Sequence, residues 1–261
     1  PRRFSRIKNS AAPLVFSRHI FELSYLLPAV AAFIIFSLTS SAVYIINDIM
    51  DVESDRAHPR KRFRAIASGE ISIKQAMVFL FVLCAFVGAS LFFIRPLFAF
   101  VIILYFITNL FYSMRVKNIV LLDVFFISFG FMLRVFGGAA AISVVVSSWM
   151  ILTTIFISLF LAISKRRGEL SQVINQENIE KQRKVLKDYD IAFADQLNTI
   201  AAAGTIISYA LYTVSERTVN TFGTEKLIYT TPFVIYGIFR YMYLMHKKNA
   251  GESPTTIVTK D

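Results

Sequence analysis

The amino-acid sequence predicts an all-α membrane protein, a bundle of helices that crosses a lipid bilayer several times. Two observations of composition predict this fold class: 56% of the 261 residues are hydrophobic, whereas soluble domains have about 45–50%, and the mean hydropathy is +0.58. The third observation is that the apolar residues gather in runs close to the length of about 20 residues that a spanning helix needs. The sole cysteine, Cys84, excludes a disulfide bond within the chain.

Eight apolar runs are candidate spans, of which the first is short and weak. They cover residues 7–16, 21–49, 73–94, 97–114, 119–142, 148–164, 191–214 and 227–245. The longest polar stretch, residues 165–190, has charges in a helix-like pattern. It is predicted to be a cytoplasmic connector or lid, or equally a solvated helix with no role in chemistry. Residues 1–261 thus form one predicted transmembrane domain.

The basic residues predict how the bundle is oriented. With the amino terminus in the cytoplasm, the inner loops hold most of the 28 Lys and Arg residues, and the outer side holds only Arg18, Arg95, Arg217 and Lys226. Cytoplasmic loops of membrane proteins carry such an excess. We therefore expect a multi-pass protein of the cell (inner) membrane. Membrane topology and anionic lipids account for most of the net charge of +11, and scattered cations do not indicate a nucleic-acid partner.

Three aspartates follow the second apolar run. If its helix continues, Asp48, Asp51 and Asp55 lie at positions i, i+3 and i+7 and share one face, which Asn47 joins. Carboxylates placed so closely repel one another, and a divalent cation with oxygen ligands would neutralise them. The pattern predicts an Mg2+ site made of these four residues and shared with substrate phosphates. The predicted orientation puts it at the cytoplasmic face.

Cationic side chains come next in the chain and at neighbouring helix ends. Guanidinium and ammonium groups are suited to phosphate oxygens, so the basic run is predicted to bind them through Arg56, Lys61, Arg62 and Arg64. His58 would hydrogen-bond a phosphate or face the lipid headgroups. Tyr112, Arg115 and Lys117 close the fourth apolar run at the same cytoplasmic level.

Two ionisable residues lie inside the fifth apolar run, where such groups indicate function. Asp123 and Arg134 are eleven residues apart, roughly 16 Å along a helix, which is too far for a direct ion pair. Each therefore needs a partner on another helix, a substrate or water. Asp123 is predicted to be catalytic, and Arg134 to form either an internal ion pair or a substrate contact. The small residues at 137–141 predict close helix packing.

Several short motifs follow one another along the chain. They are Ser41-Ala42-Val43-Tyr44-Ile45-Ile46-Asn47-Asp48, Asp51, Asp55-Arg56, His58-Pro59, Lys61-Arg62-Phe63-Arg64, Ile66-Ala67-Ser68-Gly69, Tyr112-Ser113, Lys117, Asp123, Gly130-Phe131, Leu133-Arg134, Lys165-Arg166-Arg167, Glu169-Leu170 and the segment from Arg183 to Tyr189. In this order they resemble the UbiA-type intramembrane prenyltransferase superfamily, and more narrowly its decaprenyl-phosphate phosphoribosyltransferase branch. The resemblance runs from about residue 8 to residue 260.

This resemblance implies a bundle of nine helices around a cavity that opens to the cytoplasm. It implies Mg2+-dependent transfer of a 5-phosphoribosyl group from phosphoribosyl pyrophosphate to a polyprenyl phosphate, with release of pyrophosphate. Lys165 and Arg166 would then help to hold the donor phosphates, and Lys8 and Lys117 the lipid phosphate. The family continues into a last helix beyond Asp261, so the resemblance also implies that this sequence is part of a longer chain.

Two other functions remain open from the residues. One keeps the fold but takes a prenyl diphosphate as donor and an aromatic or other small acceptor. Relatives with that chemistry carry a second motif with two or more aspartates, whereas the fifth span here offers only Asp123, which favours the phosphoribosyl donor. The other is a cation-binding transporter. The position of the acids argues against it, because they lie at a helix end and not near the bilayer midplane, where transporter sites usually lie.

Overall fold

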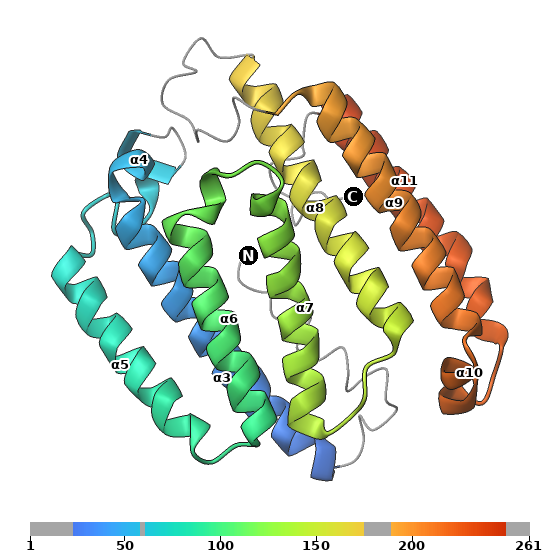
Figure 1. Ribbon diagram of the computed structural model, residues 1–261. Helices are drawn as coiled ribbons and strands as arrows, with labels where there is room; N and C mark the ends of the chain where they lie inside the picture. Colours follow the sequence, from blue (N-terminus) through green and yellow to red (C-terminus); the bar gives the residue numbers. More distant parts are fainter. Residues whose placement is uncertain (1–22, 58–60, 175–188, 249–261) are drawn as a thin grey trace.

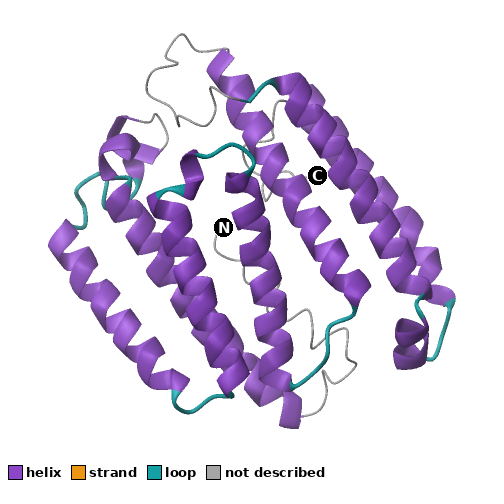
Figure 2. Cartoon of the chain, viewed as in Figure 1, coloured by secondary structure: helices purple, strands orange, loops and turns teal. Residues whose placement is uncertain are grey.

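The structure of the protein is a computed structural model that describes residues 23–57, 61–174 and 189–248. Helices joined by loops make up these residues, which contain no strand (Figure 2). The α-helices are α3 (Leu23–Met50), α4 (Val52–Ala57), α5 (Ile73–Leu91), α6 (Pro96–Met114), α7 (Leu122–Ile142), α8 (Ser148–Ile174), α9 (Ile191–Val214), α10 (Glu216–Phe222) and α11 (Thr231–Lys248). The 3-10 helices are η2 (Lys61–Phe63), η3 (Val116–Asn118) and η6 (Lys226–Thr230). The predicted all-α class is confirmed.

Six of the described helices, α3 and α5 to α9, are long and apolar enough to cross a membrane. The last predicted span, residues 227–245, instead forms η6 followed by α11, an 18-residue helix that ends in basic residues. The first predicted span, residues 7–16, lies outside the described residues. The number of spans, eight from the sequence and nine from the resemblance, therefore stays a prediction.

Local sequence explains where several helices begin. Ser72 caps α5: its hydroxyl accepts a hydrogen bond from the Gln75 amide, and the Gln75 side chain accepts one from the Ser72 amide. Pro96 starts α6 at a position where its missing N–H costs nothing. Asp190 caps α9 by accepting from the amide of Ala192.

The two larger hydrophobic cores of the described residues lie on either side of α7, which stands between α6 and α8 (Figure 1). In the first, formed by α3, α5, α6 and α7, the Phe36 ring packs edge-on against Phe98 and Tyr105 at centroid distances of 6.0 and 5.0 Å. In the second, formed by α7, α8, α9 and α11, Phe160 packs against Tyr241 at 5.2 Å. Helix α7 contributes to both cores, which explains why it is the most buried of the six apolar helices.

Small residues let neighbouring helices approach closely, as residues 137–141 predicted. A Cβ added to Gly137 on α7 would collide with the Phe36 ring of α3. A Cβ on Gly204 of α9 would lie 2.5 Å from the Phe156 ring of α8. Both glycines leave room for an aromatic ring of the neighbouring helix, which is one way in which small residues allow tight packing between membrane helices.

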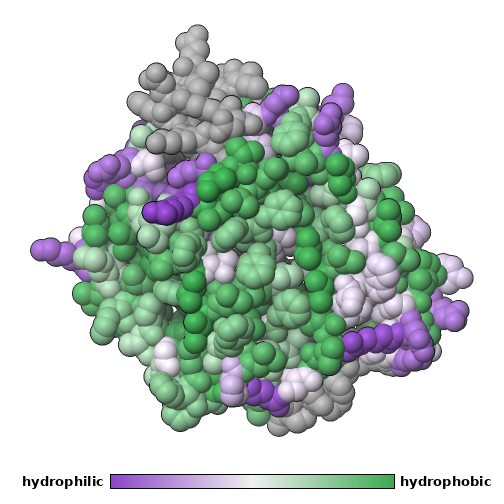
Figure 3. All heavy atoms as spheres, viewed as in Figure 1, coloured by the Kyte–Doolittle hydropathy of each residue, from purple (hydrophilic) through white to green (hydrophobic). Residues whose placement is uncertain are grey.

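The outer surface is suited to lipid. On the face shown in Figure 3, apolar side chains cover the middle of the bundle, and hydrophilic ones gather toward its two ends. Helix α5 is the clearest case, since Val78, Phe79 and Phe81 are each more than half exposed. Such a continuous apolar surface would be a liability in water and is expected in a bilayer.

Helix α8 extends further than the apolar run that predicted it. The run ends at residue 164, but the helix continues to Ile174, so the predicted connector of residues 165–190 begins inside a helix. Arg166 and Arg167 are buried there, with 1% and 8% of their surface exposed. They lie inside the bundle because each has an acidic partner on another helix. Residues 175–188 lie outside the described part of the chain.

Candidate active site

Asp48, Asp51 and Asp55 lie at the end of α3 and in the adjoining α4. Helix α3 ends at Met50 and α4 begins at Val52, but helical hydrogen bonding continues through the junction. The Asp51 amide donates to the Asn47 carbonyl at 2.9 Å, and the Asp55 amide donates to the Asp51 carbonyl at 2.8 Å. This helical spacing of the three aspartates was predicted from the sequence.

Arg64 joins two of the three carboxylates. Its Nη1 atom donates to Oδ1 of Asp48 at 2.8 Å and to Oδ2 of Asp55 at 2.7 Å. The Arg64 side chain is 39% exposed, whereas that of Asp55 is 4% exposed. One movable guanidinium nitrogen thus stands between two carboxylate oxygens, one of which is almost wholly removed from water.

Lys117 neutralises the third carboxylate from another helix end. Its Nζ atom lies 2.5 Å from Oδ1 of Asp51, and the two side chains are 18% and 25% exposed. Ser113, near the end of α6, donates to the side-chain carbonyl of Asn47. We call Asp48, Asp51 and Asp55, with Arg64 and Lys117, the aspartate cluster. It brings together the ends of α3 and α6, which are distant in the chain.

The other predicted cations belong to segments that adjoin this cluster along the chain. Arg56 is exposed and donates from Nε to the carbonyl of Ala67 at 3.1 Å. Arg62 is exposed and lies over the Phe63 ring, 4.8 Å from its centroid. Lys61 belongs to η2, and Arg115 is exposed at the end of α6. Of the predicted site residues, Lys8 and His58 lie outside the described residues.

The predicted metal ligands are suited to Mg2+ in their chemistry, but they converge only in part. Among the described residues, no group of three or more His, Cys, Asp or Glu side chains is close enough together to hold a metal ion. Asp48 and Asp55 do converge on one point, which a cationic nitrogen occupies. Mg2+ is commonly held by one or two carboxylates together with substrate phosphates. The pair therefore fits an ion that arrives with a phosphorylated ligand.

A second polar group lies on the other side of the same bundle end, and its central pair is fully buried. Asp123 on α7 is 0% exposed and accepts from Nε of Arg166 on α8 at 2.6 Å. Nη1 of Arg166 donates to Glu169 at 2.5 Å, and Nη2 donates to the Tyr112 hydroxyl at 3.3 Å. All three guanidinium nitrogens thus have partners. To reach a phosphate, as predicted from the sequence, Arg166 would have to leave these groups.

Tyr189 completes this group from the segment before α9. Its hydroxyl donates to the other oxygen of Asp123 at 2.9 Å and accepts from the Leu121 amide at 3.0 Å. Burial and the nearby Asp123 carboxylate raise the pKa of the Tyr189 phenol, so the hydroxyl keeps its proton at neutral pH. We call Asp123, Arg166, Glu169, Tyr112 and Tyr189 the buried network.

A strained turn connects the two groups. Leu121 has a φ of 67°, and the Leu122 amide donates to the Val120 carbonyl at 2.8 Å. This is a γ-turn of the rare form with positive φ, in a region that costs a bulky residue of order 1–3 kcal/mol. The turn separates Lys117 of the aspartate cluster from Asp123 of the buried network. The hydrogen bond from Leu121 to Tyr189 holds it in place.

Arg134 lies deeper in the bundle and has a partner on α6. Its Nη2 atom donates to the Tyr105 hydroxyl at 2.5 Å, and the Tyr105 hydroxyl lies 3.1 Å from that of Ser40. The guanidinium also stands over the rings of Tyr105 and Phe131. As expected from their separation, Arg134 and Asp123 contact different helices and not each other.

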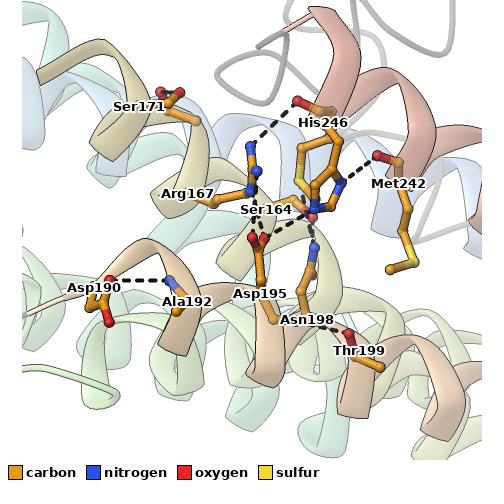
Figure 4. A network of polar contacts seen from close by, with 12 residues as sticks. Ser164, Arg167, Ser171, Asp190, Ala192, Asp195, Asn198, Thr199, Met242 and His246 are labelled. Atoms are coloured by element: carbon orange, nitrogen blue, oxygen red, sulfur yellow. Dashed lines mark hydrogen bonds and ion pairs between the residues drawn. The ribbon is translucent and has the colours of Figure 1, made fainter. Parts of the chain in front are cut away.

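A third polar group links α8, α9 and α11 (Figure 4). Asp195 accepts from Nε of Arg167 at 2.6 Å and lies 3.5 Å from His246. Asn198 accepts from the Ser164 hydroxyl at 3.1 Å. No role for Asp195 or Tyr105 was predicted from the sequence. The signal that could have found Asp195 is the adjacent pair Arg166-Arg167: neighbours on a helix point in different directions, so two buried arginines need acids on two different helices.

The comparisons with known proteins agree with this architecture. The model of the UbiA prenyltransferase family matches residues 11–257. A protein of Corynebacterium glutamicum named decaprenyl-phosphate phosphoribosyltransferase is 34% identical over 88% of this chain and 70% of its own length. Its namesake in Mycolicibacterium smegmatis is 32% identical over 88% of this chain and 73% of its own length.

A solved structure shares the fold at lower identity. It is a UbiA homolog from Archaeoglobus fulgidus bound to GPP and Mg2+, with a TM-score of 0.73, 18% identity and coverage of 98% of this chain and 89% of the homolog. At that identity the likeness concerns the fold alone. The family model, by contrast, covers almost the whole sequence, and the chain therefore belongs to the UbiA prenyltransferase family.

Proposed function

We propose that this membrane transferase moves a 5-phosphoribosyl group from phosphoribosyl pyrophosphate to a polyprenyl phosphate. The bond between C1 of the ribose and the pyrophosphate oxygen breaks, a bond from C1 to an oxygen of the lipid phosphate forms, and pyrophosphate leaves. The observation that carries the proposal is the 32–34% identity to relatives named decaprenyl-phosphate phosphoribosyltransferase over 88% of the chain.

The geometry of the aspartate cluster supports a diphosphate ligand. Carboxylates and cations alternate at one end of the bundle, so a metal ion and a phosphate can each find partners of opposite charge. Asp48 and Asp55 would hold Mg2+, with Asp51 and Asn47 as further oxygen ligands. When bound there, Mg2+ neutralises the charge that develops on the leaving pyrophosphate.

The cations of this chain would hold the phosphates. Arg64 and Lys117 already lie at the cluster, and Arg56, Lys61 and Arg62 belong to the adjoining helices α4 and η2. A phosphate monoester has its second pKa at about 6, so the acceptor is anionic at neutral pH and needs no strong general base. The task of the site is then to bring two anions together in a basic environment.

Asp123 would act through its neighbours. Both of its carboxylate oxygens accept hydrogen bonds and the residue is fully buried. We therefore assign it a positioning role: it holds Arg166 and Tyr189, and through Tyr189 the turn that carries Lys117 toward Asp51. Lys165, half-buried on α8, and Arg134 stay candidates for substrate contact. The distribution of the basic loops supports a reaction at the cytoplasmic face of the cell membrane.

A prenyl diphosphate donor is the second candidate, because the fold is like that of a homolog bound to GPP and Mg2+. Incubating membranes that contain the protein with Mg2+, a polyprenyl phosphate and radiolabelled phosphoribosyl pyrophosphate distinguishes the two. We expect label to enter the lipid fraction and removal of Mg2+ with a chelator to stop the transfer. Label that enters an aromatic acceptor only from a prenyl diphosphate would instead establish the second candidate.

A further inference from the structure

We infer that Arg64 is a placeholder for the metal: it neutralises Asp48 and Asp55 when no metal is bound, and it must leave them when a divalent cation and a diphosphate bind together. The inference rests on the proposed function only in requiring a ligand with a diphosphate. It concerns how the site is filled, whichever group that diphosphate carries.

The first support is the position of a single atom. Nη1 of Arg64 lies 2.8 Å from Oδ1 of Asp48 and 2.7 Å from Oδ2 of Asp55. A divalent cation shared by these two oxygens would have to occupy the same region between them. Arg64 and the metal are therefore mutually exclusive partners of these oxygens.

The second support is the burial of Asp55. Its side chain is 4% exposed, and a buried carboxylate without a counter-charge is costly. The site therefore needs a cation beside Asp55 at all times. Arg64 supplies that charge in the absence of metal, and its 39% exposure leaves it room to move away.

The third support is the chemistry of the exchange. A displaced arginine needs a new anion, and a diphosphate provides oxygens that match the planar guanidinium. Mg2+ in turn completes its coordination with the same diphosphate, since only two carboxylates converge here. Each ligand thus removes the cost of binding the other, and by linkage the coupling must be reciprocal.

The test uses Mn2+, which prefers the same oxygen ligands as Mg2+ and whose free ion gives a spin-resonance signal that is lost on binding. The full protein in detergent is titrated with Mn2+ alone and with pyrophosphate. A protein-free titration at each pyrophosphate concentration accounts for the complex formed in solution. The variants are Arg64→Gln and, as matched control, Arg95→Gln, which loses the same charge from an exposed position at the start of α6.

Without pyrophosphate, Arg64→Gln should bind Mn2+ roughly tenfold more tightly than wild type, as expected if a competing cation that pairs with two carboxylates is removed. Arg95→Gln should stay within about twofold, because it lies at the far end of α6 from the aspartate cluster and a distant exposed charge is screened. Pyrophosphate should strengthen Mn2+ binding more in wild type than in Arg64→Gln. Equal Mn2+ affinity of Arg64→Gln and Arg95→Gln would overturn the inference.

Two features keep the result interpretable. If Arg64→Gln does not yield folded protein, Arg64→Lys replaces it: a flexible ammonium holds two carboxylates less firmly than a guanidinium, so Mn2+ should again bind more tightly than in wild type, and equal affinity would overturn the inference. The titration contains neither ribose nor prenyl groups. Its failure is therefore distinct from a failure of the proposed transfer, which the labelled-donor experiment measures.

Discussion

The aspartate cluster and the buried network lie at the same end of the bundle and are built from the same kinds of residues, but they differ in access to water. In the cluster, the side chains of Asp48, Asp51 and Arg64 are 31%, 25% and 39% exposed, and of its five side chains only that of Asp55, at 4%, is buried. In the network, those of Asp123 and Arg166 are 0% and 1% exposed. Ion pairs of both groups have similar lengths, so geometry alone does not separate them.

The difference in burial separates what the two groups can do. An exposed ion pair contributes little to stability, about 0–1 kcal/mol, so a ligand can replace one partner at low cost. A buried pair is different, because removing one partner leaves an uncompensated charge in a medium of low dielectric constant. We therefore expect the cluster to determine activity and the network to determine stability, and the variants below test that division.

The largest effect should come from Asp48→Asn. Losing one of the two convergent carboxylates should reduce transfer by on the order of a hundredfold or more, while the midpoint of thermal unfolding stays close to that of wild type because Asp48 is partly exposed. Transfer of labelled donor and unfolding in detergent measure the two quantities. Glu53→Gln is the matched control: it removes the same charge from an exposed position of α4 and should keep its activity.

Asp123→Asn should have the largest effect on stability. Arg166 would keep its charge in the bundle interior without its fully buried partner, at a cost of about 3–5 kcal/mol in the free energy of unfolding. Asp190→Asn, an exposed aspartate that caps α9, should unfold like wild type because asparagine caps equally well. If Asp123→Asn unfolds like wild type and loses only activity, the division between the two groups fails.

A double variant refines this prediction. Replacing both partners, with Asp123→Leu and Arg166→Met, removes the buried charges together, and such replacements are often neutral or stabilising. The double variant should therefore recover part of the stability that Asp123→Asn loses. Glu169 would lose its arginine partner, but its side chain is 15% exposed, so water can solvate the carboxylate in part.

Much of this division could be predicted from the sequence, but not all of it. Apolar runs predicted the helices, and a helical spacing placed Asp48, Asp51 and Asp55 together because their contacts are local. The partner of Asp123 could not be predicted, since Arg166 is 43 positions away and their contact depends on how α7 packs on α8. For the same reason, the burial of Arg166 and Arg167 could not be predicted. Acids on α7 and α9 allow both residues to be buried, whereas a solvated helix was one of the two predictions for residues 165–190.

Tyr189→Phe should have an intermediate effect. The variant loses one hydrogen bond to a buried carboxylate and leaves the Leu121 amide without an acceptor, which should lower the free energy of unfolding by about 2 kcal/mol. Activity should fall as well, because the strained turn also positions Lys117. Tyr236→Phe removes a hydroxyl from an exposed residue of α11 and should change neither quantity. A Tyr189→Phe variant with altered stability but full activity would mean that the turn does not position Lys117 for the reaction.

The smallest effect should come from Asp195→Asn, in the group that Figure 4 shows. Asp195 is 30% exposed and its partner Arg167 is 9% exposed, so this pair lies between the two extremes of burial. We expect a loss of about 1 kcal/mol, near the upper limit for an exposed pair, and transfer within about twofold of wild type. Arg167 points toward α9 and α11, away from Asp123. The loss of its acidic partner should therefore not change the geometry of the aspartate cluster. A loss as large as that of Asp123→Asn would mean that side-chain exposure does not predict how strongly these ion pairs stabilise the bundle.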